Sequence, residues 1–189
     1  MKTKRVLLTG VLAYSLLLGA CKAKREKIGD EQLQKGQLKN ALMMYGKHLD
    51  KKGDLSDEFW DNYSLAMIRM MAKSAKDNPS SDVVNTYMTQ LPKKLDKTKL
   101  TSTAKEFVES AIGVSVALLE TQDFRLEVNA WKYLNSAKKV AKDKGAGVPE
   151  INAAIKKLEQ EYAARFLKMS QDAPEGEAKE YHLLAALVN

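Results

Sequence analysis

Few side chains in this chain have both the type and the spacing that chemistry requires. The single cysteine, Cys21, directly follows an apolar stretch, and its thiolate is a nucleophile that can be alkylated. The two histidines, His48 and His182, lie outside any HExxH motif and away from acid pairs at ligand spacing. Acidic neighbours such as Glu159 and Glu161 are interspersed with lysines, as on solvated helix faces. The sequence therefore predicts no catalytic residues, no metal site and no cofactor.

The segment that ends at Cys21 has the layout of a secretory signal peptide. Three basic residues lie among the first five, and residues 6–20 are apolar, with small residues just before the cysteine. A helix of these fifteen residues spans only about 22 Å, whereas the hydrocarbon core of a bilayer is about 30 Å thick. We therefore expect residues 1–20 to be removed rather than to remain as a membrane span.

Leu18-Gly19-Ala20-Cys21 resembles the lipobox of bacterial lipoproteins, in which leucine and two small residues precede the modified cysteine. The resemblance implies that the Cys21 thiol receives a diacylglycerol and that the new N-terminus after cleavage is acylated, for example by palmitate. Two or three acyl chains hold a protein stably on a membrane, at about 0.8 kcal/mol per buried CH₂. Because Lys22 and not aspartate follows the cysteine, the resemblance also implies the outer membrane, facing the periplasm. The alternatives are ordinary secretion with an incidental cysteine and a Gram-positive host without this sorting step.

Cleavage changes the charge of the chain. Loss of three basic residues and no acid lowers the formal net charge from +7 to +4. This weak positive charge, together with export, indicates no nucleic-acid partner. Residues 21–27 are expected to form a lipidated basic tether that lies either near anionic headgroups or free in solvent. Residues 28–189 are expected to form one domain, because a chain of this size buries roughly 70% of its unfolded surface.

The remainder of the chain is predicted to be all-helical. Alanine, leucine, lysine and glutamate dominate, and strand-like alternation is almost absent. Apolar periodicity and punctuation predict about eight helices, over residues 26–35, 37–51, 57–77, 81–90, 103–121, 123–143, 149–170 and 175–188. Short connections favour antiparallel helix pairs, which either stack as an open array or close into a bundle.

Local start and stop signals support these boundaries. Ser56 or Asp57 can cap the third helix and Asp123 the sixth, while Thr103 and Glu106 have the spacing of a capping box. The helix that begins at Thr103 is apolar nearly all round, so we expect it to be the most buried. Further signals are the break at Gly36, the glycine exit at residues 145–147 and Pro149 in a first turn.

Residues 36–49, GQLKNALMMYGKHL, resemble the second helix of a tetratricopeptide repeat. Gly36 occupies the turn position, Leu38 an apolar position, Ala41 the small position and Tyr45 the aromatic position of that motif. His48 departs from the pattern, because a second small residue is usual there.

The following segment resembles the start of a next repeat through Trp60, Tyr63, Ser64 and Met67. Weaker echoes around Trp131 and Tyr181 do not recur at a clean interval of about 34 residues. The resemblance implies an array with a concave surface that binds peptides or subunits. The alternative is an unrelated helical bundle.

Two groups of residues are candidates for binding. Adaptable methionines with a tryptophan suit a protein partner, although such residues at helical spacing more often fill the core. This group comprises Met43, Met44, Trp60, Met67, Met70 and Met71. The second group is a predicted basic loop between Leu91 and Ser102, with Lys93, Lys94, Lys97 and Lys99 opposed only by Asp96.

The favoured interpretation is an outer-membrane lipoprotein, anchored through acyl groups on Cys21, that acts as a periplasmic adaptor for a protein partner. Its helical array would bind that partner within an envelope assembly, without enzymatic activity. The alternative is an envelope lipoprotein that binds a ligand or an anionic surface through the basic loop. A wall-active enzyme is a weaker option, because it requires two carboxylates facing each other across a cleft.

Overall fold

The computed structural model describes residues 24–50, 55–121, 123–172 and 179, and all regular secondary structure in them is helical. Residues 24–34 form a first helix. It is followed by α2 (Leu38–Leu49), α3 (Asp57–Asp77), α4 (Asp82–Leu95), α5 (Thr101–Glu120), α6 (Phe124–Asp143) and α7 (Pro149–Asp172). The predicted all-α fold is confirmed. Cys21 and most of the predicted helix 175–188 lie outside the described residues.

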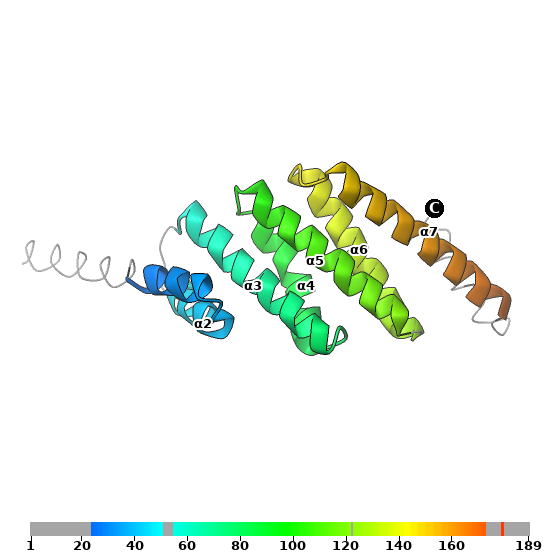
Figure 1. Cartoon of the computed structure of the whole chain (residues 1–189), viewed down its shortest axis with the longest axis horizontal. Coiled ribbons are helices and arrows are strands. Elements are labelled where there is room, and N and C mark those ends of the chain that lie inside the picture. Colours follow the sequence, from blue (N-terminus) through cyan, green and yellow to red (C-terminus); the bar gives the residue numbers. More distant parts are fainter. Residues whose placement is uncertain (1–23, 51–54, 122, 173–178, 180–189) are drawn as a thin grey trace, which may run out of the picture.

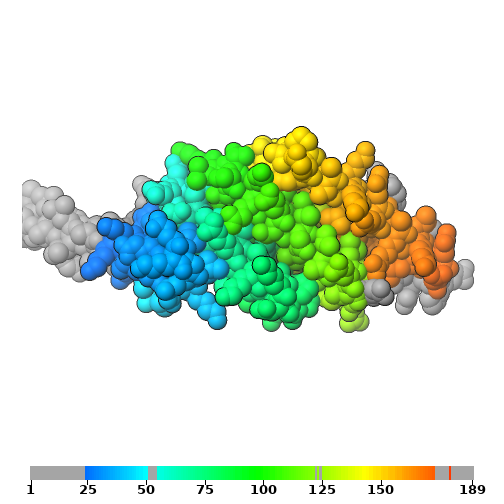
Figure 2. All heavy atoms as spheres, viewed as in Figure 1, coloured from blue at the N-terminus to red at the C-terminus, as the bar shows by residue number. Residues whose placement is uncertain are grey.

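The helices form a row of antiparallel pairs along the long axis of the molecule (Figure 1). The helix 24–34 pairs with α2, α3 with α4, and α5 with α6; α3, α5 and α7 lie side by side. Between α2 and α7, at opposite ends of the described row, there is no contact, so the array is open and not a closed bundle. As spheres, the same row is a continuous surface from α2 to α7 (Figure 2).

The repeat length differs from that of a tetratricopeptide array. Helices α3, α5 and α7 begin at residues 57, 101 and 149, so successive pairs are 44 and 48 residues apart. Both intervals exceed the repeat of about 34 residues, because α3, α5, α6 and α7 each contain at least 20 residues. Because its helices are longer, each pair in this row is longer along the helix axes than a tetratricopeptide repeat.

Several predicted boundaries are confirmed by their capping geometry. The Ser56 hydroxyl accepts a hydrogen bond from the Phe59 N–H at 2.9 Å, and the Asp123 carboxylate accepts one from the Arg125 N–H at 2.9 Å. Gly36 and Gly145 adopt φ values of 69° and 61°, in the left-handed region that glycine enters without strain. These local signals fix the end of the helix 24–34, the start of α3 and both ends of α6.

Helix α4 is longer than predicted. It continues through Pro92 to Leu95, although Pro92 has no N–H to bond the Met88 carbonyl and interior proline costs about 3 kcal/mol. Leu91 and Leu95 are both fully buried, and burial of each contributes about 1.5–3 kcal/mol, which offsets that cost. The predicted basic loop is therefore wrong in part: Lys93 and Lys94 lie in the last turn of α4.

The predicted capping box at the start of α5 is also wrong. Helix α5 begins two residues earlier than Thr103, which is buried inside its first turn. The Leu100 N–H at this helix start donates to Asp61 Oδ1 of α3, at 3.3 Å. Glu106 pairs instead with Arg69, with 2.9 Å between Oε1 and Nε. A carboxylate from α3 thus replaces the expected local cap.

The predicted tether over residues 21–27 is shorter than expected, because residues 24–27 belong to the first helix. Glu26 Oε1 accepts a hydrogen bond from the Ser56 hydroxyl at 2.8 Å, and Arg25 donates to the Lys47 carbonyl at 3.3 Å. These contacts hold the beginning of the first helix against the start of α3 and the end of α2.

The core extends through the whole described array. One cluster of buried side chains runs from Met67 on α3 to Phe166 on α7. A smaller cluster around Tyr45 and Phe59 joins the helix 24–34, α2 and α3. Helix α5 contacts α3, α4, α6 and α7, and nine of its residues are buried. The prediction that this helix is deeply buried agrees with that position.

Candidate binding site

The predicted methionine group separates into core and surface. Met67 and Met71 are buried in the main core, so they are corrected from partner contacts to core residues. The reason is that α3 is covered on two sides, by α2 and by α5. Met43 of α2 is 47% exposed, whereas Met44 and Met70 are partly exposed. Trp60 is half-buried against Phe59 and remains accessible.

A groove of about 540 Å³ lies between α4 and α6. The two helices run parallel: the Tyr133 hydroxyl, in the middle of α6, donates to Asn85 Oδ1, near the start of α4, at 2.8 Å. Near their ends, the Lys144 ammonium donates to the carbonyls of Asp96 and Thr98 at 3.2 and 3.3 Å. The lining residues on α6 and its C-cap extend from 129 to 144, a length of about 22 Å at roughly 1.5 Å per residue.

The groove has an apolar floor and basic rims. Met88, Leu95 and Val140 are buried beneath it. Lys93 on one rim, and Lys132 and Lys139 on the other, are exposed and form no ion pair within the described residues. Asp96 and Asp143 lie at one end, so lysines outnumber acids along the groove. This combination suits an amphipathic segment that carries negative charge.

A second basic feature is an aromatic–lysine cluster between the start of α3 and the end of α4. The Lys97 ammonium lies 4.2 Å from the centroid of the Trp60 ring. The Lys94 ammonium lies 4.8 Å from the Tyr63 ring and 6.0 Å from that of Trp60. Each such cation–π contact contributes about 0.5–1 kcal/mol at an exposed site. Burial, with a smaller contribution from Lys97, lowers the pKa of Lys94.

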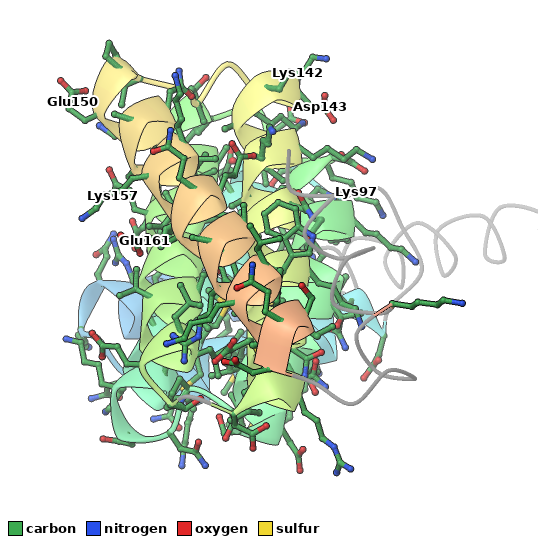
Figure 3. All side chains as sticks on the ribbon, turned by 90° about the vertical axis from the view of Figure 1, so that its right-hand side faces the viewer. Lys97, Lys142, Asp143, Glu150, Lys157 and Glu161 are labelled. Carbon is green, nitrogen blue, oxygen red and sulfur yellow. The ribbon has the colours of Figure 1, made fainter. Side chains whose placement is uncertain are left out.

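The predicted basic residues therefore do not act as one loop. Lys93 lines the groove, whereas Lys94 and Lys97 turn to the aromatic rings of α3. Lys99 pairs with Asp57, with 2.5 Å between Nζ and Oδ2. In Figure 3, Lys97 and Lys142 project from the same side of the array, and Lys157 and Glu161 of α7 from the opposite side.

Sequence reasoning missed Lys132, Lys139 and the Tyr63 contact with Lys94. The signal for the first two was present, because residues seven apart on a helix share a face. Their opposition to Lys93 was not visible, since it depends on the parallel packing of α4 and α6. Comparison of the chain with protein-family models, curated proteins and solved structures found no match.

The carboxylates buried in the described chain, Asp61 and Glu127, both bond to protein groups. Arg165 Nη2 lies 2.8 Å from Glu127 Oε1, and its Nη1 donates to the Leu119 carbonyl at 3.0 Å. No group of three or more metal-ligating side chains occurs in the residues that the structure describes. None of the helices in that part of the chain combines the length and apolar character of a membrane crossing.

Proposed function

We propose that this chain is an envelope lipoprotein that acts as an adaptor, held by acyl groups on Cys21 at the outer membrane and facing the periplasm. Its partner is a protein of an envelope assembly, bound in the groove between α4 and α6. The observation that carries this proposal is the open groove, with an apolar floor and, on both rims, lysines that have no ion pair among the described residues. No residue is assigned a catalytic role.

The groove favours a partner segment that is acidic on its edges and apolar on one face. Lysines on opposite rims would attract the acidic side chains during encounter, because complementary charge raises association rates and fixes orientation. Val140 and the partly exposed Pro92 offer apolar contact along the middle of the segment.

Lipidation is tested by replacing Cys21 with serine. Cells that express the wild-type chain are expected to incorporate labelled palmitate into it and to remove residues 1–20. The Cys21→Ser chain should do neither, because a hydroxyl is not the thiolate nucleophile that takes the lipid. Labelling and mass spectrometry of the purified chains measure both outcomes. A Lys22→Ala chain is the control and should remain labelled; label retained on Cys21→Ser would refute the anchor.

Partner binding is tested by reversing charge on the α6 rim. In the double variant Lys132→Glu, Lys139→Glu, recovery of the partner from membranes is expected to fall about tenfold or more, because rim attraction becomes repulsion. Quantitative mass spectrometry after affinity purification measures the recovery. Helix content by circular dichroism should be unchanged, since both side chains are exposed.

The matched control reverses two other exposed lysines that lie outside the groove between α4 and α6, Lys35→Glu and Lys168→Glu. This control should recover the partner as the wild type does. An equal loss in both variants, or no stoichiometric partner with the wild type, would reject the groove as the binding site.

A further inference from the structure

A partly exposed surface of mixed character lies at the turn between α4 and α5. We call it the Trp60 surface, and it consists of Trp60, Tyr63, Lys94, Lys97 and Leu100. Leu100 is 55% exposed, the highest value among the large apolar side chains of the described residues. It lies next to Lys99, which holds this turn to the first turn of α3 through Asp57. Aromatic, aliphatic and basic side chains therefore meet at one place.

Two of the lysines near the Trp60 surface differ from the third in their ion pairing within the described residues. Lys99 is neutralised by Asp57, at 2.5 Å. Lys94 and Lys97 converge on the Trp60 ring, and neither has an ion pair in the described part of the chain. Two ammonium groups held together without a carboxylate leave room for an oxyanion such as a phosphate group.

The Trp60 surface lies close to the beginning of the helix 24–34, the part of the described chain that follows Cys21 in sequence. Cys21 precedes Lys24, the first described residue, by three positions, which span at most about 11 Å. Two residues after Lys24, Glu26 accepts a hydrogen bond at 2.8 Å from the hydroxyl of Ser56, the N-cap of α3. Trp60 follows Ser56 by about one helical turn.

We propose that the Trp60 surface rests on the bilayer that anchors Cys21 and that Lys94 and Lys97 bind the phosphates of anionic lipid headgroups. This proposal rests on the lipidation proposed above. Tryptophan and tyrosine prefer the membrane–water interface, where one part of the ring is apolar and the other is wet. An acyl anchor keeps the surface near the headgroups, so modest intrinsic affinity is sufficient. Two attachments, lipid and surface, would then fix the orientation of the array.

Vesicle binding without the acyl chains tests the proposal. The processed chain, residues 21–189 with Cys21→Ser, is mixed with vesicles of equal parts phosphatidylcholine and phosphatidylglycerol. We expect it to sediment with these vesicles and not with phosphatidylcholine alone. In the Lys94→Gln, Lys97→Gln variant the partition coefficient should fall about 25-fold, because each lysine near an anionic surface contributes roughly fivefold.

Tryptophan fluorescence gives a second measurement. In a Trp131→Phe background Trp60 is the sole tryptophan, and its emission should move to shorter wavelength when the anionic vesicles are added. Unchanged emission together with full binding would place another face on the membrane and overturn the proposal. Circular dichroism of every variant confirms that the helices are intact.

A matched control separates this site from the groove. The Lys132→Gln, Lys139→Gln variant carries the same loss of charge and should bind the vesicles as the unmodified chain does. An equal loss in both double variants would indicate diffuse charge and reject the site. Binding of inorganic phosphate that competes fully with the vesicles would reassign the site to a soluble ligand. Because the vesicle test needs neither acylation nor the partner, it can fail independently of the proposed function.

Discussion

Replacing Phe107 with alanine is expected to lower the free energy of unfolding by about 3–5 kcal/mol. Phe107 is fully buried on α5, the helix that contacts α3, α4, α6 and α7. The substitution leaves a cavity that cannot close easily, because a movement of α5 toward one neighbouring helix opens a gap at another. Since a single domain has about 5–15 kcal/mol of stability in total, this is a large fraction. Urea unfolding followed by circular dichroism measures the loss.

The control for this substitution is Val116→Ala on the same helix. Val116 is 38% exposed, so its truncation leaves no enclosed cavity, and the expected change is within about 0.5 kcal/mol. Comparable losses for the two variants would mean that α5 is not packed on all sides. The contrast therefore tests the central position of α5 directly.

The helix ends that could be predicted are those set by residues within one turn of the boundary. Ser56 and Asp123 accept hydrogen bonds from N–H groups two or three residues later, so the information lies within one turn. Gly145 is similar, because its left-handed backbone ends α6 irrespective of the tertiary structure. The all-α class followed from many such signals.

The boundaries that failed depend on residues far apart in the sequence. Helix α5 begins at Thr101 with support from Asp61, 39 residues before Leu100. Helix α4 continues beyond Pro92 because Leu95 finds a buried position among other helices. Neither partner can be read from the local pattern, and proline alone favours an earlier stop.

The candidate site was predictable only as a collection of lysines. Lys93 and Lys94 are adjacent in the sequence of α4, but they point to different surfaces. Which surface each one reaches depends on the helices that pack on the two faces of α4. One side chain follows the groove toward α6, and the other turns to the rings of α3. Periodicity likewise could not separate Met43 from Met67, because it does not show that α3 has neighbours on both sides.

Replacing Arg165 with methionine is expected to destabilise the chain by about 2–3 kcal/mol near neutral pH, since it leaves a buried carboxylate without its cation. Glu127 is 1% exposed and pairs with Arg165 at 2.8 Å. This value is below the about 3–5 kcal/mol that is usual for breaking a buried ion pair, because the Arg165 side chain is one-third exposed and water can replace it. Urea unfolding at several pH values measures the cost.

The pH dependence identifies Glu127 as the cause. Burial raises the pKa of Glu127, although Arg165 opposes this, so the folded state holds the proton more tightly than the unfolded state. Its contribution to stability is therefore present below the unfolded pKa and is lost as pH rises through the folded pKa. Removal of Arg165 raises the folded pKa further, and the variant should recover stability on acidification more than the wild type does.

A second substitution makes this argument specific. In a Glu127→Gln background the Arg165→Met change should cost less than about 1 kcal/mol and lose its pH dependence, because no buried charge remains. Lys157→Met, which breaks an exposed pair with Glu161, should cost less than about 0.5 kcal/mol. If Arg165→Met is equally destabilising with Glu127 and with glutamine, its effect comes from lost packing and the hydrogen bond to Leu119. The junction of α6 and α7 would then not depend on the buried ion pair.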